Sequence, residues 1–330
     1  MDIGFARQAA VLAVGLAVTG ALGGCAGAES GPAPATTPAR PMSPAAFPKP
    51  GRRTLVDLRR GVGPGLELAP GVAVIEPGSN RFAFALFDGA RRQVTQARAA
   101  LYLAPVGGGD DVRGPFPVRD ESLRVQPRFE SRSVSRDPDA ARSVYSATLP
   151  FRATGEYEVM ALVSLDGRLV ATEPVSLRAA RRHEVPAVGE PAPRIETPTS
   201  ASVGGAIATI DTRDPPDTMH DVDFADVRGR RPVVLLFSSP ALCRSRVCGS
   251  VTDVAEQAQA EHGDEAAFIH MEVYRHNRLE EGLRSQITRW GLPTEPWAFA
   301  IDRRGRVAAR LEGAFSPREL EWALRKALRP

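Results

Sequence analysis

The 330-residue sequence contains little lysine, few cysteines and few aromatic side chains. Lysine occurs only at Lys49 and Lys326, so nearly all of the 42 basic residues are arginine, which we interpret as coding bias rather than a binding surface. The formal net charge is only +3 and the basic residues are scattered, so we predict no nucleic-acid partner. Three cysteines are too few for a disulfide-rich scaffold.

The rest of the composition is that of an ordinary globular protein. Hydrophobic residues make up 43% of the chain and charged residues 25%, which excludes wholesale disorder. The length suggests about two domains. Glycine (30) and proline (29) are plentiful, which indicates many turns, linkers and β-rich architecture.

The N-terminal part has the pattern of a signal peptide. Residues 8–24 are apolar and uncharged, but shorter than the roughly 20 residues of a membrane span. The tetrapeptide Leu22-Gly23-Gly24-Cys25 resembles the lipobox of bacterial lipoproteins. This resemblance implies that Cys25 carries the lipid and that the protein lies in the cell envelope, anchored to the outer face of the cytoplasmic membrane by this lipid alone. We therefore predict a lipoprotein signal peptide over 1–24 and a lipidated, Pro/Ala-rich linker over 25–52.

Residues 53–180 have short apolar segments separated by turn residues, with no helical pattern. The clearest pair, 156–165 and 168–177, flanks the turn Asp166-Gly167 and predicts a hairpin. Such spacing resembles an immunoglobulin-like β-sandwich, whose role in binding, spacing or docking stays open. The other predicted strands in this region are 81–87, 99–104 and 143–149. Residues 181–193 carry three prolines and are predicted to be a linker between domains.

Residues 194–330 alternate between strand and helix patterns, in the order β-α-β-α-β-β-α. This order predicts an α/β domain with a mixed sheet covered by helices. The last helix has a clear start signal, because Ser316, Pro317 and Glu319 suit its N-cap, first and third positions. The predicted strands are 232–237, 267–274, 297–301 and 306–311, and the two earlier helices are 247–261 and 279–290.

Two cysteines, Cys243 and Cys248, follow the first of these strands and accompany the start of a helix. This layout resembles the thioredoxin-like family, whose redox cysteines follow the first core strand. Residues 188–193 resemble the lead-in of extracytoplasmic thioredoxin-like proteins, and 294–302 resemble the segment around the family's cis-proline. The resemblance covers less than half of the chain. It implies a thioredoxin-like fold in which Pro296 shapes a substrate groove.

The chemistry that this resemblance implies is thiol–disulfide exchange with extracytoplasmic proteins, without a cofactor. Cys243 would attack and Cys248 would resolve, while the helix N-terminus, Arg244 and Arg246 favour the thiolate of Cys243. Four residues separate the cysteines instead of the family's two, so a bridge requires Cys243 to lie in the loop before the helix. The opposing interpretation is a non-catalytic envelope module in which the disulfide is a structural staple and the β domain does the binding.

Two further alternatives stay open. In a thiol peroxidase, Ser245 would precede the attacking Cys248. Sco-type copper chaperones share the fold, the anchor and a widened cysteine pair, but no histidine lies in the cis-proline segment of this chain. Substitute ligands would be Met219 with His220, or His270 with Met271, because thiolate, thioether and imidazole suit copper.

Two more side chains are possible accessories to the site. Glu272 lies in a predicted inner strand, where a buried carboxylate would take up a proton during exchange, although a solvated strand end is the more ordinary interpretation. Trp297 follows Pro296 directly and would either border a peptide groove or belong to the core.

Overall fold

The computed structural model describes residues 47–181 and 183–329. The predicted signal peptide, the predicted lipidation at Cys25 and most of the predicted linker therefore lie outside the described residues. Within the described part, no helix is both long and apolar enough to cross a membrane.

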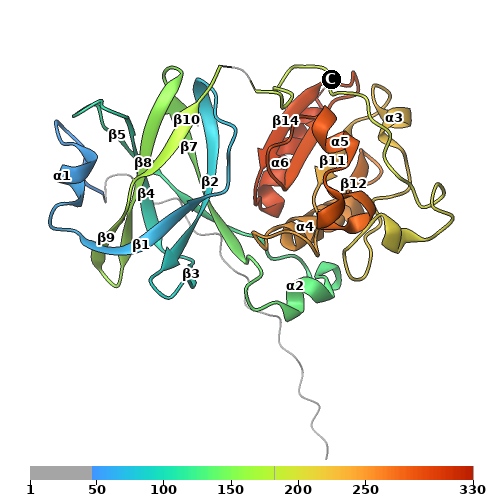
Figure 1. The fold of residues 1–330 in the computed structure, drawn as a ribbon, viewed down its shortest axis with the longest axis horizontal. Coiled ribbons are helices and arrows are strands. Elements are labelled where there is room, and N and C mark those ends of the chain that lie inside the picture. Colours follow the sequence, from blue (N-terminus) through green and yellow to red (C-terminus); the bar gives the residue numbers. More distant parts are fainter. Residues whose placement is uncertain (1–46, 182, 330) are drawn as a thin grey trace, which may run out of the picture. The chain divides into compact units, whose positions relative to one another are not determined.

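The first half of the described chain is built around one ten-stranded sheet (Figure 1). Its main strand order is β5-β4-β8-β9-β1-β2-β7-β6, with β10 paired to β8 and β3 paired to β2. The strands are β1 Gly63–Pro70, β2 Gly78–Asp88, β3 Gln93–Val94, β4 Arg98–Pro105, β5 Arg113–Pro117, β6 Arg119–Ser122, β7 Ser143–Phe151, β8 Gly155–Leu165, β9 Arg168–Thr172 and β10 Val175–Ala179. The short helices are α1 Leu55–Arg59, η2 Pro127–Phe129 and α2 Arg132–Arg136.

The predicted hairpin is confirmed, and its turn residues explain it. Asp166 and Gly167 have φ angles of 48° and 77°, which is the left-handed backbone that a tight two-residue hairpin needs. The returning strand then departs from a simple sandwich. β9 pairs antiparallel with β8 and parallel with β1, so hydrogen bonds run continuously through all ten strands instead of forming two separate sheets.

Apolar side chains fill both faces of this sheet at its centre. Alternate residues of β4, such as Leu101 and Leu103, pack in one cluster with Phe84 of β2 and Leu149 of β7. The residues between them, such as Tyr102, face a second cluster that includes side chains of α1. One side of the sheet is therefore covered by other strands of the same sheet, and the other side by α1 together with neighbouring residues such as Phe47 and Val112.

The second half holds a four-stranded sheet in the order β12-β11-β13-β14. β11 and β12 are parallel, while β13 and β14 each run antiparallel to their neighbour. The strands are β11 Val233–Phe237, β12 Ala267–Met271, β13 Trp297–Ile301 and β14 Val307–Glu312. The helices are η3 Ile207–Thr209, α3 Phe224–Val227, α4 Cys248–His262, η4 Arg275–Asn277, η5 Leu279–Glu281, α5 Ser285–Arg289 and α6 Pro317–Ala327.

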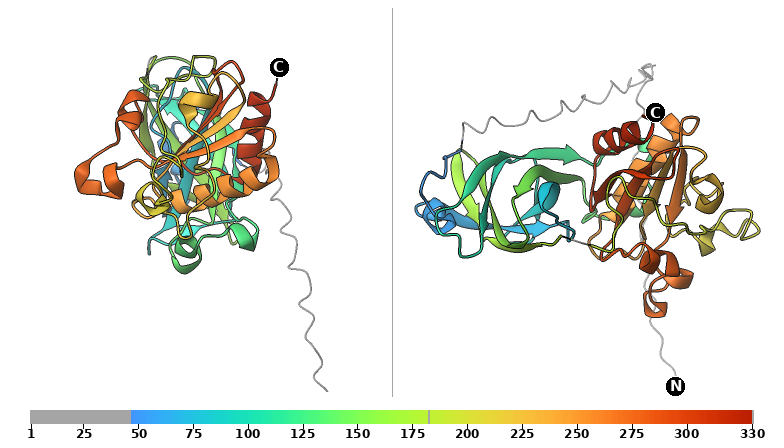
Figure 2. Two further views of the ribbon diagram at one scale, coloured as in Figure 1. Left: turned by 90° about the vertical axis from the view of Figure 1, so that its right-hand side faces the viewer. Right: turned by 90° about the horizontal axis from the view of Figure 1, so that it is seen from above.

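Helices cover both faces of this sheet (Figure 2), which explains why β11 is apolar throughout. Val234 and Leu236 pack in the cluster that includes α4 and α6, whereas Leu235 packs in the cluster that includes Trp290. The strand order and the helices between the strands are those of the thioredoxin-like fold. The predicted start of the last helix is confirmed. The Ser316 hydroxyl accepts from the backbone N–H of Glu319, and the Glu319 carboxylate accepts from the backbone N–H of Ser316.

One predicted helix is wrong. Residues 279–290 do not form a continuous helix but two short pieces, η5 and α5, because Gly282 leaves the helical region with φ 75°. Leu283 is exposed as a result. Ile287 and Trp290, from the same stretch, are buried.

Candidate active site

Cys243 and Cys248 form a disulfide with Cα atoms 5.9 Å apart, within the range that such bridges require. Cys248 is the first residue of α4, and Cys243 lies in the loop after β11. The chain turns sharply between them, because Arg246 adopts φ 56° and its N–H donates to the carbonyl of Cys243. The predicted placement of Cys243 in a loop before the helix is confirmed.

The two sulfurs differ in accessibility. The Cys248 residue is fully buried, whereas Cys243 is half-buried. Cys243 lines a cleft of about 570 Å³ together with Pro240 and Arg244 of the same loop. An incoming thiolate or disulfide can therefore reach Cys243, while Cys248 is shielded from it.

The opposite wall of this cleft comes from the β-rich half, from an arm that we define as residues 123–142 between β6 and β7. Asp137 of the arm forms an ion pair of 2.6 Å with Arg246. The Ser250 hydroxyl of α4 donates to the carbonyl of Ala141 at 2.8 Å. Gly249 lies so close to the arm that an added Cβ would come within 2.8 Å of Val134. The sequence offered no sign of this contact, since the arm carries no cysteine, histidine pair or strong apolar period.

Pro296 follows a cis peptide bond, as the resemblance implied, and the residue before it is Glu295. A carboxylate oxygen of Glu295 lies within 4.8 Å of both sulfurs. The Tyr274 hydroxyl donates to Oε1 at 3.1 Å, while Oε2 is buried without a hydrogen-bond partner. Burial raises the pKa of Glu295 to about 7, the hydrogen bond from Tyr274 opposes this rise, and the Glu272 carboxylate adds to it.

Glu295 is a functional candidate that sequence reasoning missed. The sequence did contain a sign of this role, because Glu295 directly precedes the proline at the predicted cis-proline position. A carboxylate with a pKa near neutrality beside a cysteine pair can accept or donate the proton that thiol exchange moves.

Glu272 follows directly on the last residue of β12, so it lies at a strand end, but it is buried rather than solvated. The backbone N–H and the hydroxyl of Thr212 both donate to its Oε1 at 2.7 Å. Burial raises the pKa of Glu272, and the nearby His270 opposes that rise. Glu272 acts on the site electrostatically, because its negative charge raises the pKa of Glu295.

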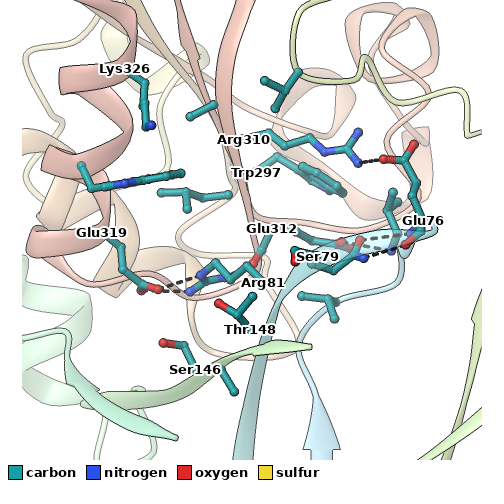
Figure 3. A pocket seen from close by; sticks show the side chains of 18 of the residues that line it. Glu76, Ser79, Arg81, Ser146, Thr148, Trp297, Arg310, Glu312, Glu319 and Lys326 are labelled. Atoms are coloured by element: carbon teal, nitrogen blue, oxygen red, sulfur yellow. Dashed lines mark hydrogen bonds and ion pairs between the residues drawn. The ribbon is translucent and has the colours of Figure 1, made fainter. Parts of the chain in front are cut away.

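Trp297 belongs to the core. It is buried, stacks on Phe299 and donates its indole N–H to Thr294. Its side chain also borders a pocket of about 840 Å³, in which Arg81 pairs with Glu319 (Figure 3). Neither cysteine lines this larger pocket, and Trp297 does not line the cleft at Cys243.

The residues considered for the alternatives lie elsewhere or are shielded. His220 and His270 gather with two aspartates rather than with the sulfurs, and Met219 is buried in the apolar cluster beside α4. In the described part of the chain, the sulfurs have only Glu295 beside them as a potential third metal ligand. The Ser245 hydroxyl lies 3.2 Å from the sulfur of Cys243, the opposite cysteine from the one that the peroxidase interpretation requires.

Comparisons with known proteins give distant likenesses only. No protein-family model matches the chain, and no curated protein matches it. A thiol:disulfide interchange protein of the thioredoxin family from Chlorobium tepidum TLS is 16% identical, with a TM-score of 0.31 over 43% of this chain and 99% of that one. A second interchange protein from Chlorobium tepidum, provisionally described as DsbE, is 17% identical with a TM-score of 0.31, covering 44% of this chain and 99% of that one.

The Lin-41 filamin domain is 12% identical with a TM-score of 0.20, covering 36% of this chain and 93% of that domain. At these TM-scores the likenesses carry no argument about fold or activity. The thioredoxin-like assignment of the second half depends on its strand order and helices, together with the disulfide before α4.

Proposed function

We propose that the protein exchanges thiols and disulfides with other proteins through Cys243 and Cys248. The observation that carries this proposal is the asymmetry of the pair. An accessible sulfur lines a cleft, its partner is buried at the start of a helix, and a carboxylate with a pKa of about 7 lies beside both. A disulfide with a purely structural role would need neither the cleft at Cys243 nor the carboxylate of Glu295.

In the reducing direction, the Cys243 thiolate attacks one sulfur of a target disulfide. The target's own S–S bond breaks, its second sulfur leaves as a thiolate, and a mixed disulfide joins Cys243 to the target. Cys248 then loses its proton and attacks the sulfur of Cys243. The mixed disulfide breaks, the target leaves as a dithiol after protonation, and the two electrons it has gained come from the oxidation of the Cys243–Cys248 pair.

Glu295 accepts the proton that Cys248 loses in the second step. The buried Cys248 thiol cannot hand its proton directly to water, whereas the ionised Glu295 carboxylate within 4.8 Å can accept it. In the oxidising direction the same steps run backwards, and protonated Glu295 returns the proton to Cys248 as it leaves.

The partners that we propose are extracytoplasmic protein thiols or disulfides. This part of the proposal depends on the lipobox-like sequence at Cys25, which would hold the protein on the outer face of the cytoplasmic membrane. It is tested separately by metabolic labelling with a palmitate analogue. Label should enter the wild-type chain and not the Cys25→Ser variant, and equal labelling of both would contradict the anchor.

The exchange itself is tested by trapping and by the reduction potential of the pair. Cys248→Ser should hold target proteins as mixed disulfides on Cys243, and the matched Cys243→Ser variant should hold none. A reduction potential between about −120 and −270 mV is expected for an exchange protein. A value below about −300 mV, with no trapped targets, would instead indicate a structural staple.

A further inference from the structure

A second polar cluster lies where a long irregular segment meets β12, on the side of the sheet that α4 covers. Asp211, Asp217 and His220 come from this segment, residues 196–223, whose one helical piece in the described structure is η3. His270 comes from β12. All four side chains are buried, and one potential ligand atom from each lies within 4.8 Å of the others.

His220 has no hydrogen-bond partner on either ring nitrogen, although the residue is only 2% exposed. Its Nε2 faces the two carboxylates, 3.5 Å from Oδ2 of Asp211 and 3.4 Å from Oδ1 of Asp217. These distances are too long for good hydrogen bonds. A buried imidazole without a partner is unusual in a folded protein and needs an explanation.

His270 has a polar partner on each ring nitrogen, and each nearest partner is an acceptor. Its Nε2 lies 3.0 Å from the carbonyl oxygen of Ser238, so this nitrogen carries the hydrogen and donates it. Its Nδ1 lies 2.7 Å from Oδ2 of Asp217 and 3.8 Å from Oδ1 of Asp211. The 2.7 Å separation between Nδ1 and Oδ2 suits a shared proton, and a metal ion bound to Nδ1 would displace that proton. A histidine that gives its other N–H to a backbone carbonyl is oriented as metal-binding histidines usually are.

The carboxylates are held in place by the backbone. The N–H groups of Arg213 and Asp217 donate to the two oxygens of Asp211, each at 2.7 Å. The N–H of Met219 donates to Oδ1 of Asp217 at 2.9 Å. These bonds fix the carboxylates while leaving each oxygen a second lone pair for a ligand.

We propose that Asp211, Asp217, His220 and His270 bind one divalent transition-metal ion, with zinc as the ion that suits the site. In a tetrahedral zinc site with bonds of about 2.0 Å, neighbouring ligand atoms are about 3.3 Å apart. The separations of His220 from the two carboxylates are close to this value. Two carboxylates, two neutral imidazoles and a divalent ion also sum to zero charge, which favours burial.

The role of the ion would be structural. Four protein ligands leave no open position for a substrate, and burial excludes water. The ion would tie the irregular segment to β12. It would add to the contacts that already hold this segment, such as the ion pair of Arg213 with Asp253 and the hydrogen bonds of Thr212 to Glu272.

The competing occupant is a proton. Burial lowers the pKa of His270, but the Asp217 carboxylate overcomes this and raises it to about 10. A protonated His270 between two aspartates would then form an ion-pair cluster, and His220 would remain without a partner.

The experiment uses the full-length protein with its disulfide intact, so that neither sulfur is a thiolate ligand. The protein is stripped with a chelator, then titrated with Zn²⁺ and, in parallel, with Co²⁺, whose visible absorption reports tetrahedral coordination. We expect one ion per chain and a rise in the melting temperature with zinc. His220→Gln should weaken binding at least about tenfold. The matched His262→Gln variant removes a surface histidine bonded to Glu265 and should bind as the wild type does.

A second measurement does not depend on the folding of any variant. With histidine labelled by ¹⁵N in the wild-type chain, zinc should shift ring-nitrogen signals of His220 and His270, and leave His183, His262 and His276 unchanged. No saturable binding to the oxidised chain, or binding that leaves the two buried rings unshifted, would overturn the proposal and favour the proton.

Discussion

Replacing Glu295 by glutamine should slow the resolving step of exchange and change its dependence on pH. The side chain keeps its size, but it loses the carboxylate that lies within 4.8 Å of both sulfurs. In the wild type the carboxylate is the active form of the base, so the rate should rise with pH through the pKa of about 7 and then level off.

The size of the effect follows from the fraction of thiolate. An ordinary thiol with a pKa of about 8.5 is only about 3% ionised at pH 7. Without a base, the attack by Cys248 would be limited to that fraction, whereas about half of Glu295 is ionised at pH 7, so the variant should be slower by about 15-fold at that pH. The rate of the variant should continue to rise up to about pH 8.5, where the two curves approach each other.

The assay measures one turnover. Cys243 is loaded with glutathione as a mixed disulfide, and the release of glutathione by Cys248 is followed between about pH 5 and pH 9. The control is Glu256→Gln, which removes a half-buried carboxylate whose pKa burial also raises. Glu256 lies about 12 Å along α4 from Cys248, so its loss should leave the profile unchanged. A Glu295→Gln profile that keeps the inflection near pH 7 would refute the assignment of the proton to Glu295.

Other predictions concern stability, measured by urea unfolding. Because burial raises the pKa of Glu295 from 4.5 to about 7, wild-type stability should fall relative to Glu295→Gln as pH rises through that window, by about 1 to 3 kcal/mol after allowing for partial screening by water. A difference that is constant with pH would contradict this. Arg213→Met strips the buried Asp253 of its ion pair and should cost about 3 to 5 kcal/mol, with partial recovery on adding Asp253→Asn. If the second change recovers nothing, the unpaired charge is not the cause. Gly249→Ala should cost about 1 to 3 kcal/mol through its clash with Val134, and Val134→Ala should relieve it unless the clash lies elsewhere.

The sequence predicted the thioredoxin-like half well because its signals are local. Apolar runs mark β11, β12 and β13, and the reciprocal cap at Ser316 marks α6. The helix over 279–290 failed because one glycine at a positive φ outweighs a plausible apolar period.

The site itself was only partly predictable. The two cysteines and Pro296 lie in recognisable sequence patterns. The role proposed for Glu295 depends instead on the antiparallel pairing that places Trp297 opposite Phe237. That register brings the start of β13 to the end of β11, where the cysteine loop begins. No local pattern specifies such a non-local contact. The same holds for the arm, whose contact with α4 depends on how the two sheets pack.

The apolar cluster beside α4 and α6 has a consequence for how the chain can be divided. Ala83, Leu123 and Val144 of the first sheet and its arm pack there together with Val251 and Leu320. Separating the two halves by a cut within 181–193 would remove part of the apolar core of each half and expose apolar side chains on both. The two halves should therefore unfold in one cooperative transition, and a destabilising substitution in the β-rich half should reduce the fraction of molecules in which the cysteine site is folded.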